Sequence, residues 1–217
     1  MVERRAEFLA AYQNAAYAAR YRRMVERIRS VERDRVGGTR LAEAVARYAF
    51  KLMAYKDEYE VARLFTDGTF RAQVAAQFEG DYALHFHLAP PTLIRPDAAS
   101  GVATKRSFGP WMEWAMRGLA RLRFLRGSAL DPFGRTAERR EERALVGDYE
   151  RLVEEMAERL DAAHHAAAIE LARIPEQIRG YGHVKQRHLA AARAKQSEAM
   201  ARWRALAAAP TSEPIAA

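Results

Sequence analysis

The chain has 217 residues, a formal net charge of +8 and no cysteine. Without thiols it cannot hold an iron–sulfur cluster, a cysteine-based zinc site, a thiolate nucleophile or a disulfide. Hydrophobic residues make up 49% of the chain, and no stretch approaches the roughly 20 apolar residues that a membrane-spanning helix needs. We therefore expect a single helical domain over 1–207 with a flexible tail over 208–217, located in the cytoplasm and not in a membrane.

Helical periodicity dominates the sequence before Gly80. The bulky residues over 3–35 predict one long helix, and Thr39 is a suitable N-cap for a second helix over 41–65. A short third helix is predicted over 70–78. The second helix has the most regular apolar side, with intervals of four and three residues: Leu41, Val45, Tyr48, Leu52, Tyr55, Tyr59 and Ala62.

The pattern changes to a period of two over 82–88, where apolar residues alternate with alanine and histidine. This alternation predicts a half-buried strand. Residues 92–95 and 102–106 can form further short strands. Together these segments predict a small antiparallel β insertion around residues 82–106.

Helices return in the second half of the chain, over 109–126, 136–160, 161–174 and 183–207. The apolar side of the first of these is formed by Trp111, Trp114, Ala115, Gly118, Leu122 and Leu125. The predicted fold class is therefore mainly α, a multi-helix domain with the small antiparallel β insertion.

A search for catalytic motifs assigns no catalytic, cofactor-binding or metal-binding residue. The chain has no Gly-x-Ser-x-Gly, no Gly-x-x-x-x-Gly-Lys-Ser/Thr and no Gly-x-Gly-x-x-Gly after a strand. His85 and His87 could present two imidazoles on one strand face, which leaves a metal-dependent reaction as an alternative. Two histidines without a third ligand are more often solvated polar residues of an alternating strand.

Basic residues are most concentrated around 115–130, a stretch without any acidic residue. One interpretation is a groove for a polyanion, either nucleic acid or the phosphates of coenzyme A. The favoured interpretation is a surface whose arginines pair with acidic residues elsewhere, because basic and acidic residues are interleaved along most of the chain. Nucleic acid is the less expected partner. The candidate polyanion patch comprises Arg117, Arg121, Arg123, Arg126 and Arg139.

Several segments, read together, resemble one known family. The most specific is Phe50–Leu64, FKLMAYKDEYEVARL, and the others are Arg5–Ala18, Phe86–Pro91, Phe108–Met112, Leu130–Gly134 and Ile178–Lys185. The chain resembles, from about residue 5 to residue 204, the C-terminal domain of the single-chain indolepyruvate:ferredoxin oxidoreductases. That domain is itself of unknown function.

The resemblance implies an enzyme system that uses thiamine diphosphate, magnesium and iron–sulfur clusters. Such a system decarboxylates 2-oxoacids, joins the acyl group to coenzyme A and passes electrons to ferredoxin. This chain has neither the diphosphate–magnesium motif nor a cysteine cluster. We therefore expect no cofactor and no active site on it, and a non-catalytic accessory domain as its function. Which 2-oxoacid is used, and whether the chain is a fragment or a separate subunit, stay open.

The expected partners are the catalytic domains or subunit of the oxidoreductase, with ferredoxin and coenzyme A as indirect partners. Two segments combine aromatic and charged residues, as the anchors of protein interfaces do. A solvated helix face with pairs one turn apart is the alternative for the first segment. The candidate interface comprises Lys51, Tyr55, Lys56, Asp57, Tyr59, Glu60 and Arg63, together with Arg179, Tyr181, His183 and Lys185.

Overall fold

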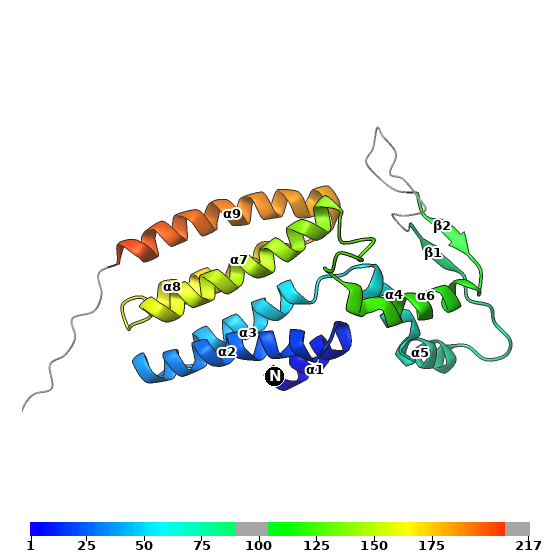
Figure 1. Cartoon of the computed structure of the whole chain (residues 1–217), viewed down its shortest axis with the longest axis horizontal. Coiled ribbons are helices and arrows are strands. Elements are labelled where there is room, and N and C mark those ends of the chain that lie inside the picture. Colours follow the sequence, from blue (N-terminus) through cyan, green and yellow to red (C-terminus); the bar gives the residue numbers. More distant parts are fainter. Residues whose placement is uncertain (90–103, 207–217) are drawn as a thin grey trace, which may run out of the picture. The chain divides into compact units, whose positions relative to one another are not determined.

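The computed structural model of the chain describes residues 1–89 and 104–206 (Figure 1). They form two compact units. The first comprises Met1–Ala10, Ala15–Ala54 and the described residues from Glu141 onward, and the second comprises Ala11–Asn14 and Tyr55–Arg140. Both units are largely helical, which confirms the mainly α fold with a small antiparallel sheet. No boundary between the units was predicted from the sequence.

The first unit is a helical bundle in which α3 packs against α2 and α8, and α9 packs against α8. Its interior is filled by large side chains that include Tyr21, Met156 and Trp203, all fully buried. None of the helices in the described residues is both long and apolar enough to cross a membrane. The helices that lie wholly or mostly in this unit are α1 (Val2–Tyr12), α2 (Ala15–Arg35), α3 (Arg40–Met53), α7 (Ala137–Arg159), α8 (His165–Arg173), the 3-10 helix η2 (Ile174–Gln177) and α9 (Gly182–Ala205).

The second unit combines short helices with a two-stranded antiparallel sheet, and α4 packs along α6. In the sheet, Phe86 pairs with Phe108 and Leu88 with Arg106. Its elements are α4 (Glu58–Thr66), α5 (Thr69–Gln77), β1 (Phe86–Leu88), β2 (Arg106–Phe108), α6 (Met112–Arg121) and the 3-10 helix η1 (Leu122–Leu125). Its apolar core contains Ala62, Phe86, Met112, Met116 and Ala120.

The structure divides both of the long helices predicted before Gly80. The predicted helix over 3–35 is interrupted between Tyr12 and Ala15, and the one over 41–65 is interrupted at 54–57. The second interruption has a local cause. The backbone of Asp57 is extended and its carboxylate accepts a hydrogen bond from the Glu60 amide, so a new helix begins there.

The β insertion is smaller than predicted within the described residues. Of the predicted strand over 82–88, the part Phe86–Leu88 is paired, with Arg106–Phe108 as its partner. This partner continues two residues beyond the predicted 102–106. The predicted strand over 92–95 and the predicted tail over 208–217 lie outside the described residues.

The first amides of α3 are capped by a side chain of the preceding helix, α2. Thr39 occupies the N-cap position, but its side chain makes no capping hydrogen bond, and its hydroxyl donates to Glu43 instead. The fully buried carboxylate of Glu32 accepts hydrogen bonds from the Leu41 and Ala42 amides, both at 2.8 Å. The His165 ring lies 2.7 Å from the same carboxylate. Thr39 is therefore the N-cap residue, as predicted, but the capping hydrogen bonds are made by the Glu32 side chain.

Candidate interaction site

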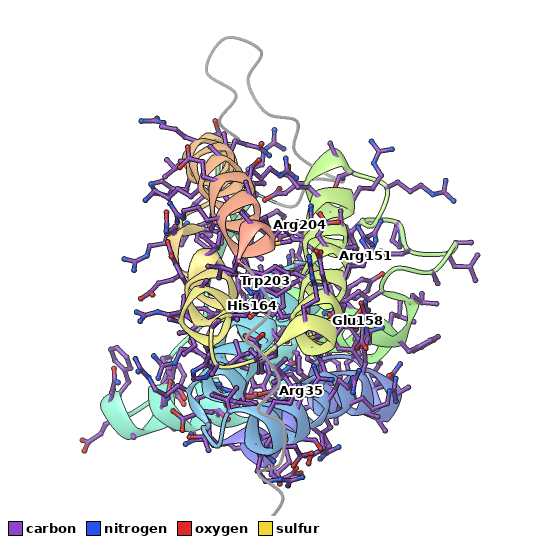
Figure 2. All side chains as sticks on the ribbon, turned by 90° about the vertical axis from the view of Figure 1, so that its left-hand side faces the viewer. Arg35, Arg151, Glu158, His164, Trp203 and Arg204 are labelled. Carbon is purple, nitrogen blue, oxygen red and sulfur yellow. The ribbon has the colours of Figure 1, made fainter. Side chains whose placement is uncertain are left out.

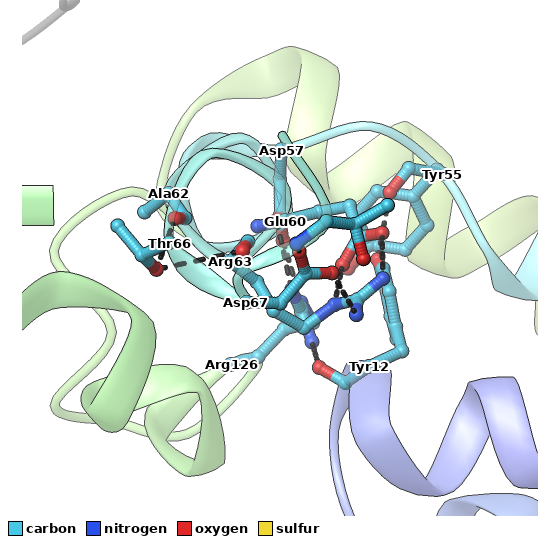
Figure 3. Close-up of polar contacts among 10 residues, drawn as sticks. Tyr12, Tyr55, Asp57, Glu60, Ala62, Arg63, Thr66, Asp67 and Arg126 are labelled. Atoms are coloured by element: carbon cyan, nitrogen blue, oxygen red, sulfur yellow. Dashed lines mark hydrogen bonds and ion pairs between the residues drawn. The ribbon is translucent and has the colours of Figure 1, made fainter. Parts of the chain in front are cut away.

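A buried ion pair organises the segment that follows α3 (Figure 3). The Arg126 guanidinium donates to both carboxylate oxygens of Asp57, with Nη2 2.8 Å from Oδ1 and Nε 2.5 Å from Oδ2. Both side chains are only 3% exposed. The same guanidinium donates to the Tyr12 carbonyl. This contact uses a backbone acceptor at the point where the predicted helix over 3–35 is interrupted.

Aromatic rings enclose this cation. The Arg126 guanidinium lies 3.7 Å from the centroid of the Tyr12 ring and 5.4 Å from that of Tyr59. The Tyr12 hydroxyl donates to the Tyr55 carbonyl at 2.8 Å. These contacts stabilise the charged guanidinium in the interior, because the ring faces carry partial negative charge. They place the three tyrosines in one internal network with Asp57 and Arg126.

The turn at 131–134 joins this network through Tyr59. The Tyr59 hydroxyl donates to Asp131, whose carboxylate also accepts from the Gly127 and Phe133 amides. Burial raises the pKa of Asp131, but the backbone donors outweigh burial and hold it below its usual value. For Tyr59, burial and then the Asp131 charge raise the pKa of the hydroxyl. Asp131 is therefore a buried carboxylate that orders the turn.

The remaining charges of α4 also pair inside the second unit. Arg63 donates to both oxygens of Glu60 at 2.8 Å and contacts Asp67 at 3.4 Å. The Glu60 carboxylate therefore pairs with the arginine three residues later. Glu58 lies 3.5 Å from Arg139. The acidic residues of this segment thus neutralise arginines of their own unit.

The candidate interface predicted from the sequence contains buried and exposed residues. In its first segment, Tyr55, Asp57, Tyr59 and Glu60 are buried, whereas Lys51 and Lys56 are exposed. These four side chains make contacts within the second unit and expose little of their surface. Arg63 is half-buried.

The second segment of the candidate interface belongs to the first unit. Arg179 and Tyr181 are exposed, with Tyr181 at 69%. Lys185 forms a salt bridge with Glu142. Lys51, from the same unit, donates to the Pro175 carbonyl at 2.7 Å. The side chain of His183 lies outside what the structure describes.

Arg179 also lines a groove of about 780 Å³ formed by α8, η2 and α9. The charges along this groove are mixed and partly paired. Arg173 contacts Glu176 at 3.2 Å, and Arg202 contacts Glu170 at 2.9 Å. The groove therefore shows no preference for one sign of charge.

The arginines of the candidate polyanion patch do not form one surface. Arg126 is buried against Asp57, and Arg139 lies beside Glu58. Arg123 donates to the Ala120 carbonyl, and Arg117 pairs with Glu113 at 2.7 Å. Arg121 is exposed and has no ion-pair partner among the described residues. Asp57 and Glu58 come from a distant segment, so a local count of charges along the sequence could not identify them as partners of Arg126 and Arg139.

The exposed side of α6 is apolar. The predicted helix over 109–126 forms as α6 followed by η1, and its buried side consists of Met112, Met116 and Ala120. The predicted apolar side faces outward instead. Its exposed members are Trp111 at 57%, Trp114 at 72%, Leu122 at 43%, and Ala115 and Gly118.

A second buried polar cluster closes one end of the first unit (Figure 2). His164 and Trp203 meet edge to face with 5.5 Å between ring centroids, and both are buried. His164 Nδ1 lies 2.7 Å from Asp161. Arg35, from α2, donates to the last carbonyls of α7, including that of Glu158 at 2.9 Å. These contacts cap α7 and fix its connection to α8.

Among the described residues, the histidines of the predicted strand belong to no group of metal ligands. His85 precedes β1, and His87 lies within β1 opposite Ser107; both are exposed. Over residues 1–89 and 104–206, no group of three or more histidine, cysteine, aspartate or glutamate side chains is arranged to hold a metal ion.

Comparison with known proteins identifies a family. No curated protein and no solved structure matches the chain. The model of one family, described as a family of unknown function (DUF6537), matches residues 1–198. The chain therefore belongs to this family of unknown function, DUF6537.

Proposed function

We propose that this chain is a non-catalytic accessory domain of a thiamine-diphosphate, iron–sulfur 2-oxoacid:ferredoxin oxidoreductase, with indolepyruvate as the candidate substrate. The six segments from Arg5–Ala18 to Ile178–Lys185 support the choice of enzyme system through their resemblance to its C-terminal domain. The domain works by binding the catalytic domains or subunit, in the cytoplasm. Ferredoxin and coenzyme A meet the catalytic part, not this chain.

One observation carries the role in binding: the apolar, tryptophan-bearing side of α6 is exposed. Trp111 and Trp114 are 57% and 72% exposed, although the opposite side of the helix is packed in a core. Exposed aromatic residues that cluster on one surface are typical of protein interfaces. In contrast, the buried charged residues of the Phe50–Leu64 segment, Asp57 and Glu60, make internal contacts that stabilise the fold.

The residues of the chain do not fit the cofactors of the proposed enzyme system. A cluster of the ferredoxin type needs cysteine thiolates, and the chain has no cysteine. Magnesium bound to a diphosphate is held by carboxylate and carbonyl oxygens. The buried carboxylates of Asp57, Glu60 and Asp131 already accept hydrogen bonds from arginine side chains or backbone amides. The proposal therefore assigns all cofactor chemistry to other domains.

Reconstitution tests the proposal. The full chain is mixed with the separately purified catalytic chain of the oxidoreductase from the same organism, prepared without this domain. We expect a stable complex in size-exclusion chromatography and in calorimetry, and indolepyruvate-dependent ferredoxin reduction only when the catalytic chain is present. Ferredoxin reduction by this chain alone, or the absence of a complex, would overturn the proposal.

A further inference from the structure

The α6 face is defined here as Trp111, Trp114, Ala115, Gly118, Arg121 and Leu122. These positions recur at intervals of three and four residues and are all exposed. A surface helix normally has one apolar side, which faces the core. Because Met112, Met116 and Ala120 already form that side, α6 has a second apolar side that the described residues leave exposed.

The two tryptophan rings are held in place while they remain exposed. Trp111 packs edge to face against Phe108, with 6.0 Å between the ring centroids. The Arg117 guanidinium lies 5.1 Å from the centroid of the Trp114 ring and also pairs with Glu113. Rings that are positioned in advance lose little conformational entropy when a partner covers them.

Gly118 lies in the middle of the α6 face, between Trp114 and Leu122. A Cβ atom at this position would meet no heavy atom within 4 Å. Glycine favours a helix less than alanine does, so neither packing inside the chain nor helix formation requires it here. A glycine on an exposed side does, however, allow the backbone of a partner helix to approach closely, because interhelical distance depends on the side chains at the contact.

Among the described residues, the charged side chains on and beside the α6 face are three arginines and one glutamate. Arg121 has no ion-pair partner among the described residues, and the carboxylate of Glu113 is shared by Arg71 and Arg117. A second copy of the chain would bring the same cations against themselves, since both sides of a twofold contact present one surface. Nucleic acid requires several cations aimed at successive phosphates, whereas this face is mostly apolar. An acidic, partly apolar partner fits the surface best.

We propose that the α6 face docks an amphipathic helix of the catalytic chain, and this inference rests on the function proposed above. The partner helix crosses α6 at Gly118, its apolar side covers the two tryptophans, and a carboxylate beside that side pairs with Arg121. This is the helix-in-groove type of recognition, in which apolar anchors give affinity and a charge pair gives register.

The test is calorimetric titration of the catalytic chain into the full chain and its variants. Trp114→Ala, Gly118→Gln and Arg121→Glu each change the α6 face without touching a buried contact. Phe78→Ala is the matched control for the tryptophan, because Phe78 is an exposed aromatic residue (58%) outside the face. Arg140→Glu is the control for the charge. Circular dichroism verifies that each variant is folded.

We expect Trp114→Ala and Gly118→Gln to raise the Kd at least about tenfold, as loss of a central anchor or of close approach does. Arg121→Glu should weaken binding by several-fold, most strongly at low salt. The two controls should leave the Kd unchanged.

Four results would overturn the inference. Tight binding of all variants would place the contact elsewhere and leave the proposed function intact, whereas no binding by the unmodified chain would overturn both. Binding of a single-stranded oligo(U) probe that is lost in Trp114→Ala would identify nucleic acid as the occupant. A dimer in analytical ultracentrifugation that Gly118→Gln dissociates would identify a second copy.

Discussion

Arg126 and Asp57 are 69 residues apart in the chain, yet the guanidinium of one donates to both carboxylate oxygens of the other in the interior of the second unit. The pair connects the start of α4 to the end of η1. Asp57 also caps α4, so one carboxylate fixes a helix start and neutralises a buried cation. The charges of Asp57 and Arg126 thus stabilise the fold of the second unit.

Removing one partner of this pair should therefore destabilise the fold strongly. We expect Arg126→Met to lower the free energy of unfolding by about 3–5 kcal/mol, because Asp57 would be left buried without its cation. Urea unfolding followed by circular dichroism measures the change. Arg121→Met, at an exposed position of the same basic stretch, should change it by less than about 0.5 kcal/mol. Similar losses in the two variants would contradict the internal role of Arg126.

The cap of α3 makes a second comparison possible. Glu32→Ala should lower the free energy of unfolding by about 2–3 kcal/mol, because the buried amides of Leu41 and Ala42 would lose their acceptor. Thr39→Ala should cost little, since the Thr39 side chain makes no capping hydrogen bond. The same urea titration measures both variants. A larger loss for Thr39→Ala than for Glu32→Ala would show that the Thr39 side chain, and not Glu32, stabilises the N-terminus of α3.

These cases show what local sequence patterns can predict. The spacing of Leu41, Val45, Tyr48 and Leu52 correctly predicted α3, because each contributes to one buried side. The division after α3 had a local signal as well: Asp57 and Glu60 have the spacing of a capping box. The apolar spacing, however, continues past Asp57 to Ala62, and it therefore predicted one uninterrupted helix.

Other features depend on contacts that spacing does not encode. The capping of α3 by Glu32 requires the fold of α2 onto α3, and the burial of Arg126 requires a partner 69 residues away. For α6, both sides of the helix are apolar, so periodicity could not decide which side is buried. The tryptophans favoured one side, and the methionines on the other side form the core.

The tryptophans provide a spectroscopic check. Trp111 and Trp114 are exposed, whereas Trp203 is fully buried. In a Trp111→Phe, Trp114→Phe double variant, the remaining emission should shift to shorter wavelength and resist quenching by acrylamide. The complementary Trp203→Phe variant should emit at longer wavelength and be quenched readily. Equal quenching of the two variants would contradict the exposed α6 face.

Two glycines should respond to alanine in opposite directions. Gly118→Ala should raise the free energy of unfolding by about 0.5–1 kcal/mol, because alanine favours the helix and the position is open. Gly180→Ala should lower it by about 1–2 kcal/mol. Gly180 has a φ of +84°, and its Cβ would lie 2.8 Å from Val184 Cγ1. Thermal unfolding of both variants measures the signs, and a loss of stability in Gly118→Ala would show that the position is packed.

The turn at Asp131 predicts a dependence of stability on pH. Burial raises the pKa of this carboxyl, but the hydrogen bonds from the Gly127, Gly134 and Phe133 amides together lower it by more than burial raises it. The folded pKa therefore lies below the unfolded value of about 3.9. The ionised form thus stabilises the fold above about pH 4, and this contribution is lost as the pH falls through the folded pKa.

Asp131→Asn tests this dependence. It should cost about 1–3 kcal/mol at pH 7, because the amide cannot accept all of the hydrogen bonds that the carboxylate accepts. The difference from the unmodified chain should shrink as the pH falls below about 4, where the native carboxylate also becomes protonated. Asp148→Asn, which removes an exposed carboxylate paired with Arg151, is the control and should change stability little at any pH. A difference for Asp131→Asn that stays constant from pH 7 to pH 3 would show that the carboxylate charge does not stabilise the turn.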